Sequence, residues 1–261
     1  MVTYLDRILE RHREVAATDS RPLDELIELA GQMPPTRPFA EALRSAVARG
    51  ELAVIGEIKR RSPSMGDLNI DLDPSRLATT YSGAGAAALS VLTDVEFFGG
   101  SVTDLQIARR VVSLPVLRKD FTVTGHDVCD ARLMGADCVL LIATALSEAE
   151  LEAMRALADR IGIEVLVEIH DEPELESALA AGATIVGVNQ RDLTTFEVDH
   201  ERALRMASII PDHVVKVAES GVRGAADARA LQHAGYDAVL VGEILVTAAD
   251  PAAVMRDLRV G

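Results

Sequence analysis

Short apolar segments alternate with helical patterns along the chain from residue 50 onward, and this alternation constrains the fold more than any other feature. Several of the segments are apolar almost throughout, as strands buried on both faces of a parallel sheet are. Helix-start signals separate them, such as the pairs Asp73-Pro74 and Asp250-Pro251. The eight predicted strands are 52–59, 87–92, 115–119, 137–142, 163–169, 184–189, 214–219 and 237–242. Eight strands alternating with helices predict a closed parallel α/β barrel.

An internal repeat supports the closed barrel. The segments GAAALSVL from Gly85, GADCVLLI from Gly135, GATIVGVN from Gly182 and GYDAVLVG from Gly235 align without gaps, at spacings of 50, 47 and 53 residues. Each begins with a glycine, which suits the left-handed residue that ends a helix. Any helix-to-strand turn favours glycine, but four copies on alternate strands favour a barrel over an open sheet. We therefore predict one domain over residues 1–261, a (β/α)8 TIM barrel.

Residues 1–50 precede the first predicted strand. Apolar residues at helical spacing predict two amphipathic helices there, and a third is expected near residues 39–49. This N-terminal helical extension should pack on the barrel. The pattern alone leaves open whether it caps one end of the barrel or only stabilises it.

Composition excludes several classes of partner. The formal net charge of −15 argues against binding to nucleic acid or to an anionic membrane surface, so an anionic ligand would need a local positive pocket. The longest apolar run, 138–146, is too short to span a bilayer, and the N-terminus does not resemble a signal peptide. Cys129, Cys138 and the histidines show no metal-ligand spacing. We expect a cytoplasmic protein without a metal or a cofactor.

Lysine is rare, and its placement is unusual. The chain has 26 basic residues, and only Lys59, Lys119 and Lys216 are lysines. All three lie in predicted strands, where lysine is disfavoured. Codon bias can explain the excess of arginine but not where the lysines are. A buried lysine can lose its proton, which arginine cannot, so these side chains are candidates for acid–base chemistry.

Charged side chains gather at the C-terminal ends of the predicted strands. Because successive strand residues point to opposite faces, residues of equal parity at the strand ends should converge. The converging set is Glu57, Lys59, Lys119, Glu168, Asn189 and Glu219. Lys216 has the opposite parity and should point toward the helices. Barrel enzymes carry their active sites at this end, and neighbouring charges push pKa values apart, as acid–base catalysis requires. A salt-bridged plug is the alternative, but a plug does not require every member at one end.

Four loops at the same end predict a phosphate site. Ser220-Gly221 follows the seventh strand and Gly242 ends the eighth, where barrels often bind phosphate. The glycines let backbone N–H groups approach an anion. The loop at 60–66, which includes Ser62, adds hydroxyls and positive charge, and Arg191 follows the sixth strand. Each signal is weak by itself, and together they favour a phosphorylated ligand.

Seven motifs, in order along the chain, make this sequence resemble the indole-3-glycerol-phosphate synthase family. They are IGEIKRRSPS (55–64), FFGGS (97–101), PVLRKDF (115–121), LVEIHDE (166–172), GVNQRDL (187–193), VAESGV (217–222) and VLVGE (239–243). The likeness covers essentially the whole chain, including the extension. The combination E-x-K-x-x-S-P-S with a later K-D-F distinguishes it from other phosphate-binding barrels.

The resemblance implies a reaction and roles for the residues. The substrate would be 1-(2-carboxyphenylamino)-1-deoxyribulose 5-phosphate, which closes to indole-3-glycerol phosphate with loss of carbon dioxide and water in tryptophan biosynthesis. Lys119 matches the general acid, and Glu168 matches a base or charge stabiliser. Lys59 matches the residue that holds the substrate carboxylate, and with Glu57 it would assist the dehydration. Asn189, Glu219 and Ser220 match further catalytic positions.

The resemblance also assigns binding residues. Those matching phosphate contacts are Ser62, Arg191, Gly221 and Gly242, and those matching the apolar pocket for the aromatic ring are Phe98, Phe121 and Leu193. Glu243 departs from the family pattern, because many relatives have a small hydroxyl residue there, and a carboxylate should repel phosphate unless it turns away. No nucleic-acid or membrane partner is implied, and we expect a monomer or a weak homodimer.

Two alternative functions stay open at this point. The chain could be another phosphate-binding barrel, such as phosphoribosylanthranilate isomerase or the tryptophan synthase α subunit, although those would be expected to use a cysteine–aspartate or glutamate–aspartate pair instead of paired lysines. It could also be a non-catalytic subunit that binds a phosphosugar, because fold alone does not decide function.

Overall fold

Eight parallel strands form a closed barrel in the computed structural model, which describes residues 3–192 and 196–261. The strands are β1 (Ala53–Ile58), β4 (Ala88–Leu92), β5 (Val116–Lys119), β6 (Cys138–Ile142), β7 (Glu164–Ile169), β8 (Ile185–Asn189), β9 (Val215–Glu219) and β10 (Ala238–Val241). Each pairs with its neighbours in chain order, and β10 returns to pair with β1. The TIM-barrel prediction is confirmed, and each strand ends within one residue of the predicted range.

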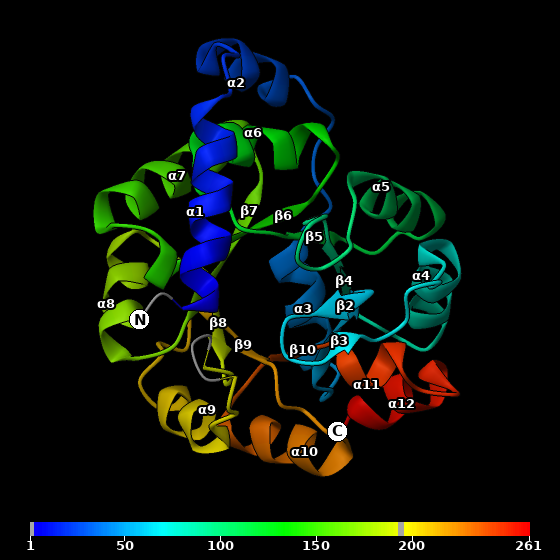
Figure 1. Cartoon of the computed structure of the whole chain (residues 1–261). Helices are drawn as coiled ribbons and strands as arrows, with labels where there is room; N and C mark the ends of the chain where they lie inside the picture. The colour runs from blue at the N-terminus through cyan, green and yellow to red at the C-terminus, as the bar shows by residue number, and fades with distance from the viewer. Residues whose placement is uncertain (1–2, 193–195) are drawn as a thin grey trace.

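Helices surround the barrel, as Figure 1 shows in a view along its axis. They are α4 (Pro74–Gly83), α5 (Val102–Val111), α6 (Gly125–Leu133), α7 (Glu148–Ile161), α8 (Glu172–Ala180), α9 (His200–Ala207), α10 (Ala225–Ala234), α11 (Glu243–Val246) and α12 (Pro251–Leu258), with a short 3-10 turn at Ala143–Ala145. The aspartates of the two Asp-Pro pairs cap α4 and α12 as predicted. Lys216 in β9 points toward the helices, as its parity predicts, because its Nζ donates a hydrogen bond to the carbonyl of Ala207 in α9 at 3.1 Å.

The four glycines of the repeat adopt the backbone conformation that the sequence predicts. Gly85, Gly135, Gly182 and Gly235 all have φ between 81° and 100°, in the left-handed region that favours glycine. The strands in the loop after β1 were not predicted. The loop after β1 forms a small antiparallel hairpin from β2 (Arg61–Ser62) and β3 (Gly66–Asp67), whose two-residue strands are too short to leave a periodic pattern.

The N-terminal extension covers both ends of the barrel. Helix α1 (Tyr4–Ala17) lies across the C-terminal ends of the strands and is drawn in front of them in Figure 1. Helix α2 (Leu23–Gly31) packs on α6 and α7. Helix α3 (Phe39–Val47) buries Phe39 and Leu43 against the inward-facing side chains at the other end.

A strand side chain holds α3 in this place. Glu164, the first residue of β7, accepts hydrogen bonds from the backbone N–H groups of Phe39 and Ala40 at 2.6 and 3.0 Å. These groups belong to the first turn of α3, where a carboxylate satisfies unpaired donors and complements the helix dipole. The extension therefore both caps and stabilises the barrel. Within the described residues, no helix is long and apolar enough to cross a membrane.

Candidate active site

The strand-end side chains converge as the alternation pattern predicts. They line a cavity of about 500 Å³ that opens at the C-terminal ends of the strands. Lys119 Nζ lies 2.8 Å from Glu168 Oε2 and 3.5 Å from Glu219 Oε2. Lys59 Nζ lies 2.5 Å from Glu57 Oε1, and Asn189 Nδ2 donates to Glu168 Oε1 at 3.0 Å. Two lysines and three carboxylates thus meet in one largely buried cluster.

The charge balance of this cluster separates the protonation states of its two central carboxyl groups. Burial opposes the ionisation of Glu168, but Lys119, His170 and the hydrogen bond from Asn189 outweigh it and lower the pKa of Glu168. Burial raises the pKa of Glu219, and the neighbouring carboxylates of Glu168 and Glu57 raise it further. Among the described residues, Glu219 Oε1 has no hydrogen-bond partner. Glu168 is therefore an anion that can stabilise positive charge or accept a proton, while Glu219 tends to keep its proton.

The charge of Lys119 is maintained by its partners. Burial would lower the pKa of Lys119, but the neighbouring carboxylates, that of Glu168 foremost, raise it above the ordinary value for lysine. Lys119 is therefore protonated in the absence of a substrate. An ammonium group that faces the cavity is a proton donor for an oxygen atom that approaches it.

We expect the raised pKa of Glu219 to make stability depend on pH. At low pH the carboxyl group is neutral in both the folded and the unfolded chain, so its contribution to stability is fully present. Above the ordinary pKa of glutamate the unfolded chain releases the proton first, and the contribution is lost as the pH rises through the raised folded value. Glu219→Gln should therefore lose less thermal stability than the wild type between acidic and alkaline pH, as measured by the melting temperature.

A surface glutamate provides the control for this measurement. Glu152 is exposed on α7, and Glu152→Gln should leave the dependence of the melting temperature on pH close to that of the wild type. Equal slopes for Glu219→Gln and the wild type would contradict the protonation state assigned to Glu219.

Two glycines make room for the carboxylates. A Cβ atom added at Gly187 in β8 would collide with Glu219 Oε1, and one added at Gly242 would collide with Glu57 Oε1. Glycine inside a strand often marks such a close approach. These glycines belong to the motifs GVNQRDL and VLVGE. The motifs therefore contribute both functional side chains and the room that the charged cluster needs.

Gly187→Ala in β8 should therefore displace the side chain of Glu219 in the neighbouring strand β9. We expect a loss of about 1–3 kcal/mol in the free energy of unfolding, because Glu219 has to move within a packed interior. The control is Gly31→Ala at the end of α2, where an added Cβ meets nothing within 4 Å, and this variant should keep wild-type stability. Denaturant unfolding of both variants measures the difference. If Gly187→Ala were as stable as Gly31→Ala, Glu219 would have room to shift.

The loops after β1, β8, β9 and β10 form one side of the cavity, which is lined by Ser62, Arg191, Ser220, Gly221 and Gly242. Ser220 and Gly221 both have positive φ, at 65° and 72°, so two successive left-handed residues shape this corner. Turns in which successive backbone N–H groups line a concave surface can bind an anion. Ser220 is held in this conformation in part by Gln190, whose Nε2 donates to its carbonyl oxygen at 2.8 Å. The structure thus gathers the residues that the sequence suggests for phosphate.

Glu243 lines the same cavity, and its Oε2 lies 3.7 Å from Arg191 Nη2. Its carboxylate is thus directed to a cation instead of being turned away from the site. An incoming phosphate would have to compete with Glu243 for Arg191.

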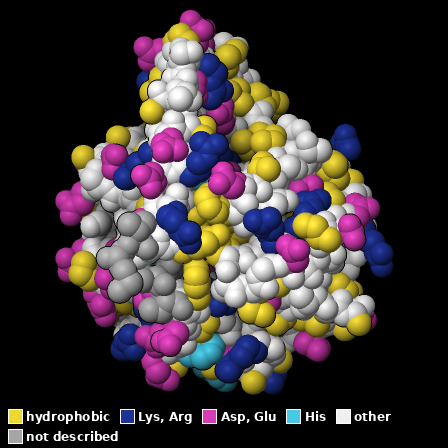
Figure 2. All heavy atoms as spheres, viewed as in Figure 1, with side chains coloured by type: hydrophobic (Ala, Val, Ile, Leu, Met, Phe, Trp, Pro, Cys, Tyr) yellow, Lys and Arg dark blue, Asp and Glu magenta, His cyan; other side chains and the backbone are white. Residues whose placement is uncertain are grey.

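The opposite side of the cavity is aromatic and apolar. The rings of Phe98 and Phe121 lie 6.1 Å apart, and both line the cavity. Tyr4, Leu5 and Ile8 of α1 complete this wall, and no sequence motif marks them as site residues. Their amphipathic spacing signalled only a helix that buries one face. Figure 2 shows hydrophobic side chains through the middle of this face, with lysine or arginine side chains on both sides. The proposed contact residue Leu193 lies outside the described residues.

His170 lies behind Glu168. Its backbone N–H and its ring Nδ1 both contact Glu174 Oε2, at 2.7 and 3.1 Å, which agrees with a place at the start of α8. Its Nε2 also comes within 4.0 Å of Glu168 Oε1.

An acid, a base, an anion-binding corner and an aromatic wall therefore share one cavity. The family model for indole-3-glycerol phosphate synthase matches residues 5–258. The chain belongs to the indole-3-glycerol phosphate synthase family. Indole-3-glycerol phosphate synthase 2 of Streptomyces coelicolor is 50% identical over 234 residues, which cover 90% of this chain and 89% of that protein. Indole-3-glycerol phosphate synthase 1 of the same organism is 48% identical over 259 residues, which cover 98% of this chain and 95% of that protein.

Solved structures of other proteins share the barrel of this synthase-family chain. Thiamine phosphate pyrophosphorylase from Pyrococcus furiosus superimposes with a TM-score of 0.60 at 17% identity, covering 79% of this chain and 93% of that one. 3-Hexulose-6-phosphate synthase gives a TM-score of 0.60 at 17% identity, covering 79% of this chain and 97% of that one. At these identities the likeness concerns the fold alone.

Proposed function

We propose that this chain catalyses the ring closure of 1-(2-carboxyphenylamino)-1-deoxyribulose 5-phosphate to indole-3-glycerol phosphate, carbon dioxide and water. The observation that carries the proposal is the position of Lys119. Its ammonium group lies between Glu168 and Glu219 at the floor of a cavity with a phosphate-like corner on one side and an aromatic wall on the other. The family membership supports the same reaction.

The first chemical step forms a carbon–carbon bond. The aromatic carbon that bears the carboxylate attacks the ketone carbon of the sugar chain, and Lys119 donates a proton to the ketone oxygen, which becomes a hydroxyl group. The electrons come from the aromatic system, so the nitrogen becomes an iminium cation. Glu168, held as an anion by Lys119 and Asn189, stabilises this developing charge.

The remaining steps restore aromaticity. The bond to the carboxylate breaks, carbon dioxide leaves, and the electron pair neutralises the iminium group. The new hydroxyl group then leaves as water with a proton from an acid, and a base removes a proton from the adjacent carbon. Lys59 holds the substrate carboxylate and, with Glu57, assists the dehydration; their ion pair at 2.5 Å on the other side of the cluster supports this part of the proposal.

Substrate binding uses the two sides of the cavity. Ser62, Arg191, Gly221 and Gly242, with Ser220 beside them, bind the phosphate, and Phe98 and Phe121 hold the aromatic ring together with Leu193. We further propose that barrel and extension form one domain, that the protein is cytoplasmic, and that it is a monomer or a weak homodimer.

Turnover of defined substrates tests the proposed function. The purified chain should convert 1-(2-carboxyphenylamino)-1-deoxyribulose 5-phosphate to a product with indole fluorescence. It should leave phosphoribosylanthranilate unchanged, and it should not cleave indole-3-glycerol phosphate. Isomerisation or cleavage would identify one of the other phosphate-binding barrels, and binding without turnover would identify a non-catalytic subunit.

A further inference from the structure

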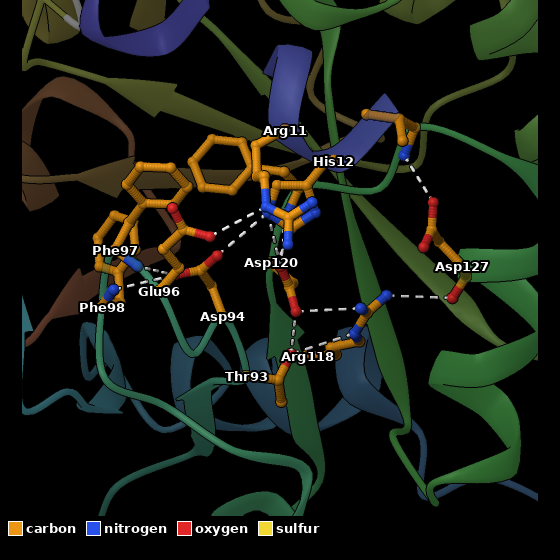
Figure 3. A network of polar contacts seen from close by, with 12 residues as sticks. Arg11, His12, Thr93, Asp94, Glu96, Phe97, Phe98, Arg118, Asp120 and Asp127 are labelled. Carbon is orange, nitrogen blue, oxygen red and sulfur yellow. Dashed lines mark hydrogen bonds and ion pairs between the residues drawn. The ribbon is translucent and has the colours of Figure 1, made fainter. Parts of the chain in front are cut away.

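Helix α1 forms part of the cavity wall although it belongs to the extension and not to the barrel. Tyr4, Leu5 and Ile8 face the cavity, so substrate binding depends on how firmly the helix is attached. One turn after Ile8, on the same side of the helix, His12 contacts the barrel. Its Nε2 lies 3.1 Å from Asp94 Oδ2 and 3.8 Å from Asp120 Oδ1. Figure 3 shows how these residues are grouped.

The two aspartates hold the loops that carry the aromatic residues of the cavity. Asp94 Oδ1 accepts hydrogen bonds from the backbone N–H groups of Phe97 and Phe98 at 2.6 and 2.9 Å. Asp120 Oδ1 accepts one from the N–H of Phe121 at 2.8 Å. His12 therefore connects α1 with both aromatic loops at once.

Contacts between aromatic rings also join α1 to the two loops. The imidazole ring of His12 lies 5.4 Å from the ring of Phe121, which in turn lies 6.1 Å from that of Phe98. Tyr4, near the start of α1, makes an edge contact with Phe97 at 5.9 Å. Helix and loops thus form one packed wall, with His12 behind it and outside the cavity lining.

The contact of His12 with the aspartates is buried, which makes it energetically important. The side chains of Asp94 and Asp120 are only 4% and 5% exposed, and that of His12 is 20% exposed. Burial opposes the ionisation of Asp94, but the hydrogen bonds from His12 and from the loop backbone outweigh it and lower its pKa. A buried carboxylate that loses its partner is strongly destabilised.

The remaining carboxylate oxygen of this group also has donors. Asp120 Oδ2 accepts from Arg118 at 3.0 Å and from the hydroxyl of Thr93. His12, Asp94 and Asp120 are close enough together to be considered as metal ligands, but all four carboxylate oxygens already face protein donors. His12 is therefore hydrogen-bonded to the loop of Asp94 and lies against Asp120, so it connects α1 with both loops.

We propose that His12 is a positioning residue for the ring closure: by bridging Asp94 and Asp120 it fixes α1 and the loops of Phe98 and Phe121 as the wall that grips the aromatic ring of the substrate. This inference rests on the proposed function. It assigns no chemical step to His12. Asp120 keeps Arg118 and Thr93 when His12 is removed, so the strand end that carries Lys119 keeps its place.

The test separates KM from kcat. In His12→Ala, KM for the substrate should rise roughly tenfold, as the loss of a part-buried hydrogen bond to a charged group predicts, while kcat stays within about threefold of the wild type. His12→Gln places an amide N–H near the position of Nε2 and should restore most of the affinity. A purely structural loss would lower the amount of folded enzyme without this selective change in KM.

A neighbouring ion pair offers a matched control. Arg11 joins the same helix to the same loop through Glu96, with the two side chains 48% and 58% exposed. Arg11→Ala should leave KM unchanged, because exposed ion pairs contribute little. Amide hydrogen exchange should show faster exchange in α1 for His12→Ala than for Arg11→Ala.

Two results would overturn the inference. The first is an equal KM for His12→Ala and Arg11→Ala. The second is a double-mutant cycle in which His12→Ala and Asp94→Asn raise KM additively, since coupled residues should not be additive. Failure of the wild-type enzyme to turn over would instead refute the proposed function, so the two claims fail in different ways.

Discussion

Replacing Lys119 with alanine should reduce kcat by about 10²–10⁴-fold, the usual contribution of a positioned general acid, while KM stays within a few-fold of the wild type. Lys119 is the cation nearest to both central carboxylates, and no phosphate or aromatic contact is assigned to it. Removing it takes away the proton for the ketone oxygen without removing the groups that bind the ends of the substrate. Steady-state kinetics, followed by indole fluorescence, measure both constants.

Lys216 provides the control for Lys119→Ala. It is also a buried lysine in a strand, but its Nζ bonds the carbonyl of Ala207 and lies 3.4 Å from Asp212, outside the barrel. Lys216→Ala should lower stability and leave kcat unchanged. A Lys119→Ala enzyme with wild-type kcat would show that another group donates the proton.

Replacing Glu168 with glutamine should also lower kcat by about 10²–10⁴-fold, and more than it raises KM. Glutamine keeps the shape of the side chain and an acceptor oxygen for Asn189. It has no negative charge to stabilise the iminium cation, and it cannot accept a proton. The carboxyl group of Glu219 stays 3.5 Å from Lys119 Nζ, so the lysine keeps a polar neighbour. The measurement is again kcat and KM for the ring closure.

Glu164 lies on the same strand and the same side as Glu168, at the opposite end of the barrel. Because it caps α3, Glu164→Gln should cost about 1 kcal/mol of stability and leave kcat unchanged. A higher KM with unchanged kcat in Glu168→Gln would make Glu168 a group that binds substrate and transition state equally, which contradicts its role here.

The sequence predicted the barrel and its charged cluster because both follow from local periodicity. Apolar strands define the barrel, and parity places Glu57 beside Lys59 and directs Lys216 outward. The left-handed glycines follow from the same local rules. Strand-end residues converge in any closed parallel barrel, so no long-range information was needed to bring them together.

The contributions of the extension could not be predicted in this way. Nothing near His12 in the sequence indicates that it meets Asp94 and Asp120, which lie 82 and 108 residues away. The amphipathic pattern of α1 predicts a buried face but not the surface that buries it. The pairing of Glu243 with Arg191 likewise depends on how two loops approach each other. These contacts are set by tertiary packing, which periodicity does not encode.

The most direct test of the account compares two products of one reaction. The purified chain is given 1-(2-carboxyphenylamino)-1-deoxyribulose 5-phosphate with an isotope label in its carboxyl group, and labelled carbon dioxide and indole product are measured together over time. Ring closure with decarboxylation predicts equal amounts of carbon dioxide and indole product. It also predicts that the Lys119→Ala enzyme forms both products far more slowly than the wild type. Absence of indole product with the wild-type chain, or indole product formed without release of the label, would contradict the account.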